Sequence, residues 1–283
     1  MQTARGKHNK RWRQWGEAIL DALLCQGLVA QLCFNIGLHG KLSVSTYDLK
    51  LPAHKRLAQP LKIAFLSDFH AGPTTDPRIF EQAFQVIREQ EPALLLLGGD
   101  FISHSAHYIM QLHKLFSELK LPLGSFAVLG NHDLWSDHQL ITESLERAGV
   151  QVLINRNLQL KAPFDSISIC GIDDPWTGDV NAEDCFKDAR NTRLLLMHAP
   201  DGLLFLAQHQ FDFAFAGHTH GGQIAKSNGQ ALLTPHGPLS SHYVHGLFPL
   251  EGNGALIVSR GIGCSNVPIR IHADPELVFC TIE

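Results

Sequence analysis

The sequence predicts an α/β fold in which two sheets pack between layers of helices. From residue 62 onward, short apolar runs alternate with helical segments, which is the pattern of strand-helix-strand units. The first runs are four to six residues long and end in Gly or Ser, as buried strands do. Later strand candidates are separated by Gly/Pro-rich turns, without a linker or an internal repeat. We therefore expect one domain over residues 60–283.

The predicted elements follow one another in a regular order. The runs KIAFLS, ALLLLG and SFAVLG predict the first strands, and helices are expected over residues 76–90 and 137–148, with another between the second and third runs. The later strand candidates are SISICG, RLLLMH, FDFAFAG, ALIVSRG and ELVFCTI. Strand-helix-strand repeats take right-handed crossovers, so we expect sheets with helices against their faces.

The composition indicates a globular chain without a basic surface field. Of the 283 residues 45% are apolar, enough for a substantial core, and the formal net charge is -4. That charge balance does not favour nucleic acid as a partner. The six cysteines are scattered and include no Cys-x-x-Cys pair, so we expect buried apolar side chains rather than a zinc ribbon.

Residues 1–45 predict a basic amphipathic helix ahead of the domain. The stretch ARGKHNKRWRQW carries five Lys or Arg and two Trp. Polar residues interrupt the apolar run that follows, which argues against a signal peptide or a membrane span. Several apolar residues recur at three- and four-residue steps and so share one helical face: Trp12, Trp15, Ile19, Ala22, Val29, Cys33 and Ile36.

Two interpretations of this helix stay open at this point. Basic charge and tryptophans suit the anionic inner face of the cytoplasmic membrane, which predicts a cytoplasmic protein with peripheral lipid contact through residues 1–40. Alternatively the helix packs on the body of the protein, because the polar Gln26 lies on the apolar stripe.

Polar side chains of one kind follow the apolar runs. In chain order they are Asp68 and His70, then Asp100, then Asn131, His132 and Asp133, then His198, and finally His218 and His220. In open α/β sheets, ligands bind beyond the carboxyl ends of the strands, so residues that follow different strands can converge on one crevice. Each residue alone has an ordinary structural explanation, but their repetition at successive strand ends favours a shared site.

This set of side chains is typical of a metal centre with two ions. Apart from His132 and Asp133 it offers two carboxylates, one amide oxygen and four imidazoles. A tetrahedral zinc ion uses four ligands, so seven are too many for one structural ion. A bridging carboxylate lets two ions share them at a separation of about 3.5–4 Å. The mixed nitrogen and oxygen ligands favour Mn²⁺, with Fe or Zn as alternatives, over Ca²⁺ or Mg²⁺.

The motifs D-x-H, G-D, G-N-H-D, a lone H and G-H-x-H, in this order, resemble those of the calcineurin-like metallophosphoesterases. The resemblance extends over about residues 62–283 and implies a four-layer α/β/β/α sandwich. It implies these ligands: Asp68, His70 and His220 for one ion, Asn131, His198 and His218 for the other, and Asp100 as the bridge. It further implies that His132 lies beside the substrate phosphate and that Asp133 orients it.

Three longer stretches narrow the resemblance. GHTHGGQI, GIDDPWTGD and VSRGIGCSNVPIRI are similar to a bacterial branch of small membrane-associated phosphodiesterases, which includes a UDP-2,3-diacylglucosamine pyrophosphatase of lipid A synthesis. The basic N-terminal helix with its tryptophans is what suggests a lipid-linked substrate such as UDP-2,3-diacylglucosamine, while soluble nucleotides or simple diesters fit the same site residues equally well. One departure is informative, because iron-tyrosinate purple phosphatases have Tyr three residues after the bridging Asp, where this chain has Ser103. We expect no purple colour.

The expected activity is hydrolysis of a phosphodiester or pyrophosphate bond. Two divalent ions lower the pKa of a shared water, so that a metal-bound hydroxide attacks the phosphorus in line, while His132 either stabilises the equatorial oxygens or protonates the leaving group. Arg260 and His104 are candidate substrate contacts, Arg260 because a guanidinium binds phosphate oxygens bidentately. Two alternatives remain: a general soluble phosphodiesterase or phosphatase, and a non-catalytic scaffold on the same fold.

Overall fold

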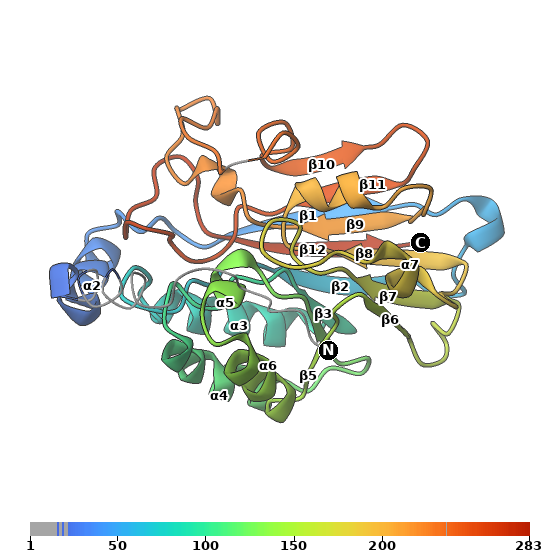
Figure 1. Cartoon of the computed structure of the whole chain (residues 1–283), viewed down its shortest axis with the longest axis horizontal. Helices are drawn as coiled ribbons and strands as arrows, with labels where there is room; N and C mark the ends of the chain where they lie inside the picture. The colour runs from blue at the N-terminus through green and yellow to red at the C-terminus, as the bar shows by residue number, and fades with distance from the viewer. Residues whose placement is uncertain (1–15, 17–18, 20–21, 236) are drawn as a thin grey trace.

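Two six-stranded mixed sheets lie face to face and form the body of the molecule (Figure 1). The computed structural model describes residues 16, 19, 22–235 and 237–283. The first sheet has the spatial order β1 (Ser43–Leu49), β12 (Glu276–Ile282), β2 (Leu61–Leu66), β3 (Leu94–Leu97), β4 (Ser125–Ala127) and β5 (Val150–Val152). The second has the order β10 (Gly246–Pro249), β11 (Ala255–Val258), β9 (Phe213–Ala216), β8 (Thr192–Leu196), β7 (Ile167–Gly171) and β6 (Arg156–Gln159).

Helices cover the outer face of each sheet, which gives the expected four layers. The first sheet is covered by α3 (Arg78–Gln90), α4 (Met110–Glu118) and α6 (His138–Arg147), as Figure 1 shows. The second is covered by α7 (Ala182–Phe186) and the 3-10 helix η4 (Pro200–Phe205). The remaining helical segments are η1 (Cys25–Gly27), α2 (Leu28–Asn35), η2 (Ala53–Lys55), η3 (Ala106–Ile109), α5 (Asn131–Trp135) and η5 (His220–Gly222).

The strand period of two explains why both faces of each sheet are apolar. In β2, Phe65 packs in the core between the sheets, while Ala64 and Leu66 pack against the helices. In β9, Phe215 lies between the sheets and contacts Phe65 edge-on, with ring centroids 5.4 Å apart. Such continuous apolar runs belong to strands buried on both faces.

The first sheet begins earlier in the chain than the boundary expected at residue 60. β1 pairs in parallel with β12 over its whole length, from Ser43 beside Glu276 to Leu49 beside Ile282. Residues 43–49 therefore belong to the sheet and not to the N-terminal helix, which was expected to reach residue 45. This strand was not predicted because polar residues lie on both of its faces, Val44 is exposed, and only Leu49 is fully buried, so no alternating apolar pattern marks it.

The N-terminal region packs on the body with one face and exposes another. Ala30 and Cys33 of α2 are buried, whereas Leu28, Leu32 and Ile36 are more than half exposed. The expected apolar face is thus divided, because Cys33 points inward and Ile36 outward. Trp12 and Trp15 lie outside the described residues. Within the described part of the chain, no helix combines the length and apolar character that crossing a membrane requires.

Candidate metal centre

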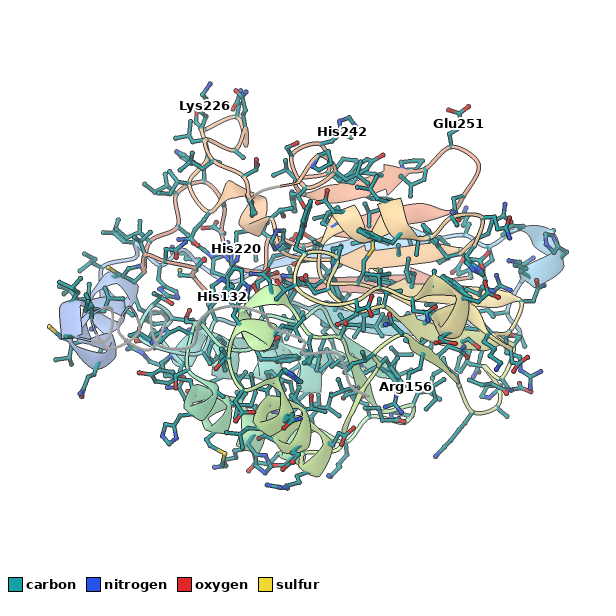
Figure 2. All side chains as sticks on the ribbon, viewed as in Figure 1. His132, Arg156, His220, Lys226, His242 and Glu251 are labelled. Carbon is teal, nitrogen blue, oxygen red and sulfur yellow. The ribbon has the colours of Figure 1, made fainter. Side chains whose placement is uncertain are left out.

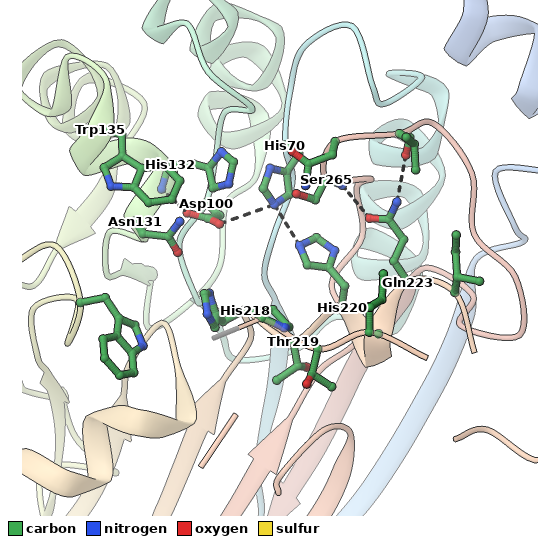
Figure 3. Close-up of a pocket in the computed structure, with 18 residues that line it drawn as sticks. His70, Asp100, Asn131, His132, Trp135, His218, Thr219, His220, Gln223 and Ser265 are labelled. Atoms are coloured by element: carbon green, nitrogen blue, oxygen red, sulfur yellow. Dashed lines mark hydrogen bonds and ion pairs between the residues drawn. The ribbon is translucent and has the colours of Figure 1, made fainter. Parts of the chain in front are cut away.

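The loops that leave β2, β3, β4, β8 and β9 meet at one end of the two sheets. Figure 2 places His132 from the first sheet and His220 from the second at this end, and Figure 3 shows them around a common space. Each of the five strands is parallel to its neighbour among them within its own sheet, so their carboxyl ends share one edge. All seven expected ligands are brought together there, as the following distances show.

The first group consists of Asp68, His70 and His220. The Nε2 atoms of His70 and His220 are 3.0 Å apart, and His220 Nε2 is 3.6 Å from Asp68 Oδ1. One ligand atom from each residue lies within 4.8 Å of the others, and all three residues are buried. These three donors are the set expected for one ion.

The second group consists of Asp100, Asn131, His198 and His218. His198 Nε2 lies 3.4 Å from Asp100 Oδ2 and 3.1 Å from Asn131 Oδ1. His218 contributes its Nδ1, which lies 3.1 Å from His198 Nε2. Both histidines and the amide oxygen therefore face a second point next to Asp100.

Asp100 joins the two groups through a single oxygen. Its Oδ2 is 3.5 Å from His70 Nε2 in the first group and 3.4 Å from His198 Nε2 in the second. Its other oxygen, Oδ1, accepts a hydrogen bond of 2.8 Å from the backbone N–H of His132. This bond fixes the carboxylate so that Oδ2 occupies the bridging position.

Several ligands have an unusual backbone conformation. Left-handed φ values occur at Asp68 (54°), His70 (44°), Asp100 (53°), His218 (70°) and His220 (53°). For residues other than glycine this region costs on the order of 1–3 kcal/mol each and is concentrated at functional sites. The sharp turns let alternate residues of D-x-H and G-H-x-H both point at the site.

Groups behind the ligands set their orientation. His198 Nδ1 donates to the carbonyl of Gly98 at 2.8 Å, which leaves Nε2 as the free donor atom toward the site. The backbone N–H of His218 donates to both oxygens of Asp68 at 3.0 Å. The Ser103 hydroxyl donates to the carbonyl of His70 at 2.9 Å, so the position that carries Tyr in purple phosphatases is used here to hold a ligand loop.

Burial and neighbouring charges shift the pKa values of the ligands. Burial and the neighbouring Asp100 raise the pKa of Asp68 to about 6. Burial, aided by the positive charge of Arg270, holds the pKa of His70 and of His220 well below the usual range of histidine, so both rings stay neutral. Burial works against ionisation of Asp100, but the neighbouring His198 and His132 charges hold its pKa well below the usual range.

These donors fit two divalent ions. Neutral imidazole nitrogens and ionised carboxylates are the forms that bind metals, and they converge here from both sheets with donor atoms 3.0 to 3.6 Å apart. Such buried like-charged carboxylates are costly unless a cation lies between them. Metal binding is thus the interpretation that the geometry and burial support.

His132 is beside the ligands, but its partner differs from the one expected. Its Nδ1 donates to the carbonyl of Ser103, and its ring is edge-on to His70 with centroids 4.6 Å apart. Asp133 does not orient this ring. Its carboxylate accepts backbone N–H groups from Gly130 at 3.0 Å and Phe101 at 2.9 Å, so it ties the β3 and β4 loops together. Burial and Asp100 raise its pKa to about 8.

The two expected substrate contacts lie away from the cleft that the ligands line. Arg260 Nη2 donates to the Ser43 hydroxyl at 3.0 Å and lies 3.6 Å from Glu276, so its charge is used in the fold. His104 packs edge-on against Tyr108. Neither residue is among those that line the cleft.

Three further residues around the site were not among the predicted site residues. Arg270 is buried and contacts His220, while Trp135 and Trp176 line the cleft next to the ligands. The motif GIDDPWTGD contains Trp176 and gave a usable signal, since a proline-tryptophan pair in a turn after a strand predicts an aromatic side chain near the strand ends. Arg270 lies in the stretch VSRGIGCSNVPIRI, which was singled out as a motif, but its contact with His220, 50 residues away in sequence, could not be predicted from it.

Comparison with known proteins agrees with this geometry. Residues 61–222 match the family model described as calcineurin-like phosphoesterase. The chain is 32% identical to phosphodiesterase YaeI of Escherichia coli (strain K12) over 239 residues, 81% of this chain and 85% of that protein. It is 29% identical to each of two uncharacterized metallophosphoesterases of Bacillus subtilis (strain 168), YkuE (78% and 79% covered) and YkoQ (84% and 89%). The chain therefore belongs to the calcineurin-like phosphoesterase family, and it is a metallophosphoesterase.

Proposed function

We propose that this chain is a dinuclear metal-dependent phosphodiesterase, with Mn²⁺ as the first ion to test and Fe or Zn as alternatives. The observation that carries the proposal is the position of Asp100, whose Oδ2 lies between His70 and His198 at 3.5 and 3.4 Å. One carboxylate oxygen shared by two ligand groups is the arrangement that a two-metal hydrolase needs. The similarity to a named phosphodiesterase at 32% identity favours a diester over a monoester.

The residues divide the work of phosphoryl transfer between them. Two divalent ions would supply Lewis acidity and lower the pKa of water, which makes hydroxide available for in-line attack near neutral pH. Asp68, Asp100, Asn131 and the four histidine ligands would hold these ions. His132 lines the cleft with its Nδ1 bound to the Ser103 carbonyl, so its Nε2 is free to donate a proton to the leaving oxygen.

The test is hydrolysis of paired substrates by metal-stripped protein supplied again with Mn²⁺. Bis-p-nitrophenyl phosphate reports diesterase activity and p-nitrophenyl phosphate reports monoesterase activity. Asp100→Asn should abolish turnover and reduce the bound metal, whereas Asp188→Asn, at an exposed position, should change neither. Full activity of Asp100→Asn, or turnover that survives chelation, would refute the proposal.

A second proposal concerns the substrate's setting, a lipid-linked phosphoester or pyrophosphate at the inner face of the cytoplasmic membrane. It is supported by the exposed Leu28 and Leu32 of α2, by the exposed Ile36 directly after it, and by the five Lys or Arg of the preceding basic stretch. UDP-2,3-diacylglucosamine is the first substrate to try, and its hydrolysis would make this a lipid A enzyme.

Membrane contact is tested by sedimentation with vesicles of anionic or neutral phospholipid. Because Ala30 and Cys33 are buried, removal of the whole helix would damage the core, so the better variant replaces only Leu28, Leu32 and Ile36 by Gln. Binding to anionic vesicles should fall at least tenfold, and a control with the exposed Leu204→Gln should bind as before. Equal binding of the triple variant would refute membrane contact through α2.

A further inference from the structure

The metal ligands occupy only part of a cleft of about 640 Å³. The rest of the cleft extends past His132 and Trp135 on one side and past Gln223 and Ser265 on the other, as Figure 3 shows. This volume is in the range of sites that bind a small molecule. A phosphate held at the ligands would leave most of it for another part of the substrate.

Two tryptophans line this remaining space, and both are held in place. The Trp135 ring lies 4.9 Å from the His132 ring, between centroids. Trp176 is about half exposed, yet its backbone is fixed by Asp174, whose fully buried carboxylate accepts the N–H groups of Trp176 at 3.1 Å and Thr177 at 2.6 Å. The turn therefore holds the backbone of Trp176 in place where its indole lines the cleft.

The opposite rim is held by a buried amide. Gln223 Nε2 donates to the carbonyls of Val267 at 2.9 Å and Ile269 at 3.1 Å, and its Oε1 accepts the N–H of Ser265 at 2.8 Å. The amide is fully engaged in holding this loop. The loop carries Val267, which lines the cleft and is 44% exposed, and Leu233 beside it in the lining is 77% exposed.

The charge of the lining restricts what fits there. Among the described residues that line the cleft there is no Lys or Arg, and the one carboxylate is the metal ligand Asp100. A second phosphate away from the metals would find no cation to bind. Exposed Leu233, Val267 and Trp176 would instead gain free energy by covering an apolar group.

We propose that this part of the cleft is a subsite for an aliphatic chain carried by the phosphoester, with Trp176 and Val267 as walls that determine specificity. The inference rests on the proposed function, since it names the substrate class of the same site. It predicts that the affinity for the phosphoryl group alone is modest and increases with the length of an attached alkyl chain.

The test measures binding rather than turnover, with methyl-, butyl- and octylphosphonate as probes for Mn²⁺-loaded protein. Their P–C bond resists hydrolysis, and dissociation constants from calorimetry at concentrations below micelle formation give a clean series. Each fully buried methylene strengthens binding about fourfold. In an open cleft the added methylenes are buried only in part, so octylphosphonate should bind about 10- to 100-fold more tightly than methylphosphonate. The ratio should fall toward one in Trp176→Ala and in Val267→Asn, and persist in Leu204→Asn.

The outcomes distinguish failure of the aliphatic subsite from failure of the proposed phosphodiesterase function. Equal affinities for methyl- and octylphosphonate, or no binding of either, would overturn the subsite. Tighter binding of phenylphosphonate than of octylphosphonate would also overturn it, since the tryptophans would then select an aromatic group. Chain-length dependence without diester hydrolysis would refute the proposed function and leave the subsite standing. Hydrolysis without chain-length dependence would do the reverse.

Discussion

Arg270 Nη2 lies 3.2 Å from Nδ1 of His220, on the side of the ring away from the Nε2 that faces the metal site. The guanidinium is buried, and its other donors go to backbone carbonyls, including Ala273 at 2.8 Å and Arg260 at 2.9 Å. It therefore ties the last loops of the chain to a metal ligand. Its positive charge also helps burial to lower the pKa of His220, which keeps the ring in the neutral form that binds metal.

Replacement of Arg270 should mainly weaken metal binding. In Arg270→Lys we expect about 10- to 100-fold lower Mn²⁺ affinity, because an ammonium group cannot replace the guanidinium bonds to the carbonyls of His220, Gly263 and Ala273 that position the loop of this ligand. Titration with Mn²⁺ followed by calorimetry measures it. Arg193→Lys is the matched control, since that guanidinium also donates to backbone carbonyls but lies far from the site in the second sheet. Unchanged affinity in Arg270→Lys would contradict the role given to this contact.

His132→Ala should separate chemistry from metal binding. If His132 donates a proton, kcat should fall by about 10²- to 10⁴-fold while both metals remain bound. The geometry also brings His132 together with His70 and Asp100 within ligand distance, so metal content is the decisive second readout. Elemental analysis after gel filtration should give the same metal content as the wild type. A loss of one ion would identify His132 as a ligand, and His54→Ala, exposed in η2, should change neither value.

The fold could be predicted from the sequence wherever a strand is buried on both faces. Runs such as LLLL in β3 have one physical explanation once they alternate with amphipathic helices. β1 was not predicted because polar residues occupy both of its faces and only its last residue is buried, and because its place beside β12 depends on pairing with the other end of the chain. Such long-range pairing leaves no local signal.

The metal ligands could be predicted from the sequence, whereas the groups that orient them could not. Asp68, Asp100, His198 and the others lie directly after predicted strands, so the parallel arrangement alone brought them together. Many of the groups that orient the site residues could not be predicted, because they are backbone groups or side chains from distant parts of the sequence. The Ser103 carbonyl binds the His132 ring, and the loop N–H groups of Gly130 and Phe101 bind Asp133. Arg260 was predicted to bind the substrate phosphate because it carries a guanidinium, but in the structure this group lies 3.6 Å from Glu276.

Gly217 should be intolerant of any side chain. A Cβ there would lie 2.0 Å from Ser67 Oγ and 2.2 Å from Asp68 Oδ2, so Gly217→Ala must displace a metal ligand. We expect loss of at least one ion and a destabilisation of about 1–3 kcal/mol from overpacking. Gly229→Ala is the control, because its left-handed φ of 81° imposes backbone strain while nothing lies within 4 Å of the added carbon. Metal analysis and thermal unfolding of both variants would show whether the loss is specific to the site, and full metal content in Gly217→Ala would contradict it.

Glu276 should make the protein sensitive to acid. This buried carboxylate accepts from His245 Nε2 at 2.9 Å, from the Ser45 hydroxyl and from the Arg260 N–H at 2.9 Å. Burial alone would raise its pKa, but the bonds from His245 and Ser45 lower the pKa to about 2 from an ordinary 4.5. A carboxylate whose pKa is lower in the folded than in the unfolded chain stabilises the fold at any pH above the unfolded pKa, here by on the order of 3 kcal/mol. That stabilisation is lost as the pH falls from about 4.5 toward 2. In Glu276→Gln the unfolding free energy should be lower at pH 7 and should decline less between pH 5 and 3. Urea unfolding between pH 3 and 7 measures the free energy of unfolding and its decline with acid. The exposed Glu146→Gln is the control and should follow the wild type. An identical acid dependence in Glu276→Gln and the wild type would contradict the stabilising role of the Glu276 carboxylate.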